Sequence, residues 1–76
     1  MTGVRVFVNG TALEVAPGAT ALEAVAIADR KEAEGVAAGL RLITDSRGIA
    51  IPPRSTVYGG AIFRTVRAKP SIGDDG

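Results

Sequence analysis

Two residue types that carry much of protein chemistry are missing, because the 76-residue sequence contains no cysteine and no histidine. Without cysteine the chain forms no disulfide and offers no thiolate nucleophile or thiolate metal ligand. Without histidine it lacks the commonest general base and metal-binding side chain. The sequence also shows no nucleophile elbow, phosphate-binding loop or metal-ligand spacing, so we expect neither an enzyme nor a bound cofactor.

The sequence also has few aromatic residues and a net charge close to zero. Phe7, Tyr58 and Phe63 are the only aromatic residues, so valine, isoleucine, leucine and alanine must form the core. The net charge is +1, which gives no strong field for nucleic acid or anionic lipid. No apolar run approaches the ~20 residues that cross a bilayer, and the first residues lack the pattern of a signal peptide. A single disulfide-free domain of this kind is typical of cytoplasmic proteins.

The first part of the chain predicts a β-hairpin. Residues 4–8 have valine at every second position, which is typical of a strand with one buried face. Asn9-Gly10 favours a tight hairpin turn, because both residues tolerate positive φ. The alternation resumes over residues 11–16, and Pro17-Gly18 ends this second strand because proline has no N–H to donate.

Helical signals follow the hairpin. Thr20 and Glu23 fit a capping box, in which each side chain meets a free backbone N–H of the first helical turn. We predict a helix over about 21–30, with an alanine-rich stripe that lies close to the sheet. The stripe consists of Leu22, Val25, Ala26 and Ala28. The charged run over residues 29–34 indicates a solvated helix face or helix end, and a short second helix closes at Gly39.

Three further strands are expected, over residues 40–44, 49–51 and 61–67. In the last strand we place Phe63 toward the core, because the opposite facing would put the charge of Arg64 at the centre of the sheet.

These elements predict an α+β domain over residues 1–67 and a flexible tail over residues 68–76. A mixed sheet of four to five strands carries one main helix across one face. The simplest closure places the last strand beside the first and parallel to it, in agreement with the right-handed crossover rule. This arrangement is the β-grasp architecture of ubiquitin-like proteins.

Several short motifs resemble the opening of the ThiS/MoaD sulfur-carrier family: Val8-Asn9-Gly10, Glu14-Val15, Gly18-Ala19-Thr20 and Leu22-Glu23-Ala24-Val25, with Gly60-Ala61-Ile62 before the last strand. The resemblance implies a sulfur carrier of thiamine or molybdopterin biosynthesis. Its terminal carboxylate, on Gly76 here, would be adenylated with ATP and converted to a thiocarboxylate. The implied partner is an E1-like adenylating enzyme or a cofactor synthase. The carriers end in Gly-Gly, whereas Asp75 precedes Gly76 in this sequence.

Two alternatives stay open beside the carrier. The first is a β-grasp interaction module, a monomer or weak dimer, which docks on a protein through the open sheet face that carries Arg5 and Phe7. The second is a TGS-like, RNA-associated domain with a basic patch drawn from Arg5, Arg41, Arg47, Arg54, Arg64, Arg67 and Lys69. Because acidic residues are interleaved with these, nucleic acid is not the expected partner, and neither is a membrane.

Overall fold

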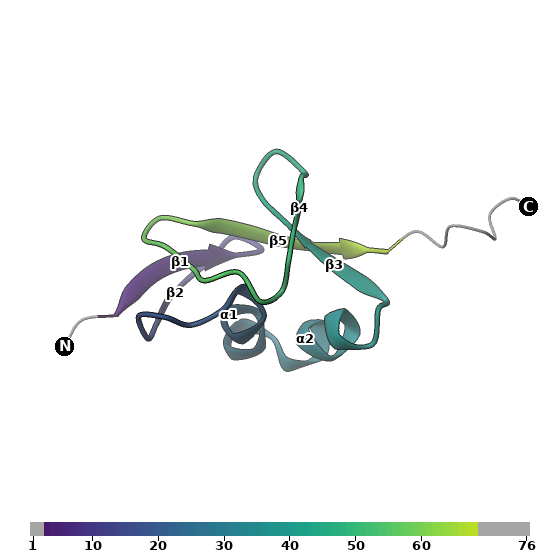
Figure 1. Cartoon of the computed structure of the whole chain (residues 1–76), viewed down its shortest axis with the longest axis horizontal. Helices are drawn as coiled ribbons and strands as arrows, with labels where there is room; N and C mark the ends of the chain where they lie inside the picture. The colour runs from purple at the N-terminus through teal and green to yellow at the C-terminus, as the bar shows by residue number, and fades with distance from the viewer. Residues whose placement is uncertain (1–2, 69–76) are drawn as a thin grey trace, which may run out of the picture.

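The computed structural model describes residues 3–68, which form two layers, a five-stranded sheet and two helices that lie against one of its faces (Figure 1). No helix of the described chain covers the other face. The elements in chain order are β1 (Val4–Val8), β2 (Thr11–Val15), α1 (Ala21–Ala28), α2 (Arg30–Ala37), β3 (Arg41–Thr44), β4 (Ala50–Ile51) and β5 (Ile62–Arg67). Neither helix within residues 3–68 has the length and hydropathy needed to cross a membrane.

The strand order in the sheet is β2-β1-β5-β3-β4. β1 pairs antiparallel with β2 and parallel with β5, while β3 pairs antiparallel with both β5 and β4. The predicted α+β class and the parallel pairing of the first and last strands are therefore confirmed. Asn9 (φ 49°) and Gly10 (φ 86°) adopt the left-handed backbone that the predicted hairpin turn needs.

The core lies between the sheet and α1. Val6 of β1 and Val25 of α1 are fully buried, and burial of a valine side chain contributes about 1.5–3 kcal/mol. Ala21 and Ala24 are also fully buried on α1, so alanines of this helix pack against the sheet. They are not the alanines of the predicted stripe, because the helix turns positions 21, 24 and 25 toward the sheet and leaves Ala26 and Ala28 exposed. Phe63 of β5 is 3% exposed, which confirms its predicted inward facing.

The boundary between the two predicted helices lies at Asp29, earlier in the chain than predicted. α1 ends at Ala28 because Asp29 has an extended backbone (φ −159°, ψ 104°). The Asp29 carboxylate accepts hydrogen bonds from the backbone N–H groups of Lys31 (3.0 Å) and Glu32 (3.4 Å), which makes Asp29 the N-cap of α2. Arg30 therefore begins α2 instead of ending the first helix. The sheet is covered by two eight-residue helices and not by one main helix.

The start of α1 and the end of α2 lie where the sequence predicts them. Thr20 Oγ1 accepts a hydrogen bond from the Glu23 N–H (3.1 Å), and Glu23 Oε1 accepts one from the Thr20 N–H (2.9 Å), so the predicted capping box forms. α2 closes at Gly39 (φ 82°), where the Leu40 N–H donates to the carbonyl of Gly35 (2.8 Å). This hydrogen bond belongs to a Schellman motif, and it satisfies a carbonyl that the helix leaves free.

The strands begin or end within a residue of the predicted bounds, because turns compete for their terminal hydrogen bonds. Asp45 Oδ1 accepts hydrogen bonds from the N–H groups of Arg47 (2.8 Å) and Ile49 (3.0 Å), so β4 begins only at Ala50. Of the predicted tail, Ala68 is described, and the flexibility predicted for residues 69–76 lies outside the described residues.

Candidate protein-docking face

The sheet face without helices is built by side-chain alternation. The three valines of β1 point toward the helical side, which leaves exposed Arg5 and half-buried Phe7 on the other side, the open face. In the strand register Phe7 lies beside Ala12 of β2 and Ile62 of β5. Both residues predicted for partner binding therefore lie on the open face, on β1, which is an internal strand between β2 and β5.

Large apolar side chains from three adjacent strands lie on this face and form what we call the open-face patch: Phe7, Leu42, Ile62 and Val66. Leu42 and Ile62 are each 44% exposed and Val66 is 41% exposed. Phe7 pairs in register with Ile62, and Leu42 pairs with Val66. The sheet is thus apolar on both sides, although a sheet with one solvated face normally has a polar outer surface. Grouped exposed apolar side chains of this kind mark interaction sites.

Two basic side chains accompany the open-face patch. Arg64 lies between the two patch residues of β5, and Arg5 lies two positions before Phe7. Arg5 is opposite Glu14 in the register, whereas Arg64 is opposite the uncharged Thr44. Within residues 3–68 no salt bridge involves Arg64. The open face therefore combines apolar surface with a cation, and an apolar partner surface flanked by carboxylates is its complement.

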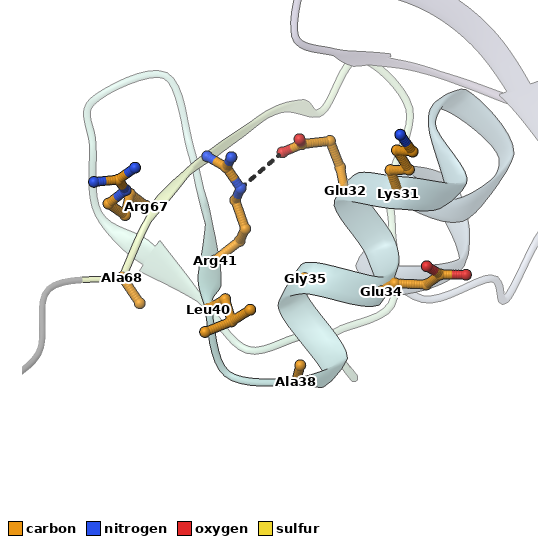
Figure 2. Close-up of a pocket in the computed structure, with 9 residues that line it drawn as sticks. All are labelled: Lys31, Glu32, Glu34, Gly35, Ala38, Leu40, Arg41, Arg67 and Ala68. Carbon is orange, nitrogen blue, oxygen red and sulfur yellow. Dashed lines mark ion pairs between the residues drawn. The ribbon is translucent and has the colours of Figure 1, made fainter.

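A network of hydrogen bonds and one ion pair connects side chains on the opposite, helical face of the sheet. The Thr65 N–H donates to Asn9 Oδ1 (3.0 Å), and Asn9 Nδ2 donates to the Thr65 hydroxyl (2.9 Å). The Thr65 hydroxyl in turn donates to Glu32 Oε1 (2.6 Å), which lies 3.6 Å from Arg41 Nε (Figure 2). The network links the hairpin turn, β5, α2 and β3. Sequence reasoning missed it because Thr65 is 56 positions from Asn9 and 33 from Glu32.

The basic residues considered for an RNA-binding surface do not share one face. They divide as follows: Arg5 and Arg64 on the open face, Arg41 and Arg67 on the helical face, and Arg47 and Arg54 in loops. Arg47 is paired with Asp45 (3.2 Å), and Lys69 lies outside the described residues. The described part of the chain therefore presents no continuous basic surface for a phosphate backbone.

Metal-ligand clusters and unpaired buried polar side chains are both absent from residues 3–68. Residues 3–68 contain no group of three or more Asp and Glu side chains placed to hold a metal ion. In the same range every buried side-chain nitrogen and oxygen has a hydrogen-bond partner. Gly76, the residue that the family resemblance implies as the thiocarboxylate, lies outside the described residues.

No protein-family model, characterised protein or solved structure matches this chain. The geometry of the described residues and the resemblance of the short motifs are therefore the features that point to a function.

Proposed function

We propose that this chain is a ubiquitin-like β-grasp interaction module that docks on a partner protein through the open-face patch. The strand order β2-β1-β5-β3-β4, with parallel β1 and β5 and both helices on one face, supports the β-grasp assignment. The single observation that carries the function is the patch itself. Its four apolar side chains lie on a face that no helix of the described chain covers.

The energetics favour burial of the patch by a partner. Full burial of a leucine, isoleucine or valine side chain contributes about 1.5–3 kcal/mol, and three of the patch residues keep two fifths or more of their surface exposed. The side chains project from paired strands, so little backbone freedom is lost on binding. Arg64 fixes the orientation of the partner on the patch, because a carboxylate of the partner must pair with Arg64 when the two apolar surfaces come into contact.

The proposal is tested with a matched pair of exposed isoleucines. A photo-crosslinking residue at position 62 or 66 captures the partner in the source cells, and the purified partner is then titrated with variants of the chain. Ile62→Asp alters the open face, whereas Ile27→Asp alters α1, where Ile27 is 62% exposed. We expect Ile62→Asp to weaken binding by about tenfold or more, because it places a charge against apolar surface.

Ile27→Asp is expected to bind like the unmodified chain. Equal loss in the two variants, or capture of the same partner from position 27 as readily as from position 62, would contradict docking through the open face. Circular dichroism of both variants checks that the fold is retained.

We also propose a second function, sulfur carriage, in which the same open face docks on an E1-like adenylating enzyme and Gly76 is activated. It is supported by the motif resemblance, which covers the turn at Asn9-Gly10 and the capping box at Thr20. Mass spectrometry after incubation with an E1-like enzyme, ATP and a sulfur donor tests it, since a terminal oxygen must be replaced by sulfur. A chain truncated after Pro70 separates the functions, because a docking module keeps its partner while a carrier loses its reaction.

A further inference from the structure

A second surface lies on the helical side of the sheet, away from the open-face patch. It is an open cleft of about 830 Å³ between α2, the start of β3 and the end of β5 (Figure 2). Arg41 of β3 and Arg67 of β5 line it, together with Leu40, Ala38 and Ala68. The cleft therefore combines two guanidinium groups with apolar surface.

Close backbone contacts shape the walls of the cleft. Gly35 has no side chain, and a Cβ there would lie 2.8 Å from Arg41 Cγ, so the absence of that atom lets the aliphatic part of Arg41 lie against α2. The Ala68 N–H donates to the carbonyl of Leu40 (2.9 Å), which fixes the end of β5 beside the start of β3. The arginine positions are therefore set by the sheet and not by a loose loop.

The two arginines form an incompletely neutralised pair. Arg41 and Arg67 are directly opposite in the antiparallel register, where like charges destabilise a sheet. Glu32 Oε1 lies 3.6 Å from Arg41 Nε, but this oxygen also accepts the short hydrogen bond from Thr65. Within residues 3–68 no salt bridge involves Arg67. An added carboxylate between the guanidinium groups would relieve the repulsion and accept charge-assisted hydrogen bonds.

The surroundings of the arginines define the class of ligand. Leu40 is 66% exposed beside them, which offers a contact to an apolar side chain. Lys31, Glu32 and Glu34 also line the cleft, so its three cations are offset by two carboxylates. This small net positive charge suits a ligand with one or two carboxylates better than a polyphosphate or a nucleic-acid backbone. We propose that this cleft binds an acidic segment of a partner protein, with a carboxylate held by Arg41 and Arg67 and a neighbouring apolar side chain against Leu40.

The test uses the peptide fluorescein-Gly-Leu-Asp-Glu-Gly-amide, which places a carboxylate next to an apolar side chain, and the full chain, with binding followed by fluorescence anisotropy. Arg67→Gln is the informative variant, because Arg67 takes no part in the Thr65 network. We expect it to weaken binding roughly tenfold, the usual effect of removing one charged hydrogen-bond partner. Arg54→Gln is the matched control, since it removes the same charge from a loop that does not line the cleft.

Leu40→Ser is expected to weaken the same peptide by a smaller factor, through the loss of apolar contact. The proposal fails if the peptide does not bind, if Arg54→Gln weakens it as much as Arg67→Gln, or if the amide peptide with Gln and Asn in place of Glu and Asp binds equally well. It also fails if inorganic phosphate displaces the peptide at equal concentration, because the site would then recognise anions in general. Ile62→Asp leaves this binding unchanged, which separates the cleft from the open-face patch.

Discussion

The two faces of the sheet carry similar apolar residues, but these residues are buried on one face and partly exposed on the other. On the helical face Val6, Ile43 and Phe63 are at most 3% exposed, and α1 contributes alanines that allow close packing. On the open face Leu42 and Ile62 have the same apolar character but stay 44% exposed. The first face stabilises the fold by removing apolar area from water, while the second leaves apolar area that only another molecule removes.

Apolar content alone therefore does not identify the core of this chain. Side chains alternate along each strand, so apolar residues lie on both sides of β1 and β5. The side that the two helices cover becomes the interior. A residue on the helical face should therefore affect mainly the free energy of unfolding. A residue on the open face should affect mainly binding.

The two phenylalanines provide the largest test of this comparison. Phe63→Ala is expected to lower the free energy of unfolding by about 3–5 kcal/mol, because the side chain is buried and a cavity remains. Phe7→Ala is expected to cost less than about 2 kcal/mol, since Phe7 is only half-buried. Urea unfolding followed by circular dichroism measures both. Equal losses would show that the open face is part of the core.

The contact between α2 and β3 gives the next largest effect. Gly35→Ala gains about 1 kcal/mol of helix propensity. It also forces a Cβ to within 2.8 Å of Arg41 Cγ, and overpacking of this kind costs about 1–3 kcal/mol. We expect a net loss of about 1 kcal/mol in thermal unfolding. The same substitution in an Arg41→Ala background should instead stabilise the chain, and a loss in both backgrounds would rule out the contact as the cause.

The Thr65 network gives a smaller effect on the helical face. Thr65→Val keeps the side-chain shape but removes the hydroxyl that binds Asn9 and Glu32, which should cost about 1 kcal/mol. Thr11→Val, at an exposed position on β2, is the control and should stay within about 0.5 kcal/mol. If chemical denaturation finds the two variants equally stable, the network does not hold the helical face.

The smallest effect concerns the turn before β4, outside both faces. The hydrogen bond from the Ile49 backbone N–H holds the pKa of Asp45 below its ordinary value of 3.8, and the Arg47 N–H and guanidinium act in the same direction. Because the folded-state pKa is the lower one, the stabilisation is complete above 3.8 and is lost as the pH falls through the folded-state value.

Melting temperatures of the unmodified chain and of Asp45→Asn, measured from neutral pH to about pH 2, check this expectation. The difference between the two proteins should be small at neutral pH and should vanish in acid. A difference that stays constant over the whole range would show that the ionised carboxylate contributes nothing.

Local signals predicted much of the fold. Asn9-Gly10, the capping box at Thr20 and the C-terminal Gly39 each act through hydrogen bonds or backbone angles within a few residues, so the sequence contains the whole cause. The division of the helices at Asp29 was missed, because an aspartate in a charged run suits a helix end as well as a new N-cap. In the sequence Gly35 only weakens the predicted helix. The structure shows that a side chain at this position would collide with Arg41.

The candidate docking face was predicted only in part. Alternation on the first strand indicated that Arg5 and Phe7 lie on the open face. Alternation on the last strand placed Ile62 and Val66 opposite Phe63, but did not show which neighbours they meet. The register decides that Ile62 lies beside Phe7 and Val66 beside Leu42.

The amino-acid order was enough to place the Asn9-Gly10 turn, the Thr20 capping box, the helix end at Gly39 and the strand facings, because each depends on neighbours within about one helical turn or one strand. Only the folded chain shows the register between β1 and β5, the buried side of α1, the Asn9–Thr65–Glu32 network, the open-face patch and the arginine pair in the cleft. These features join residues that are distant in the chain, and they exist only once the chain has crossed the sheet and the strand register is fixed.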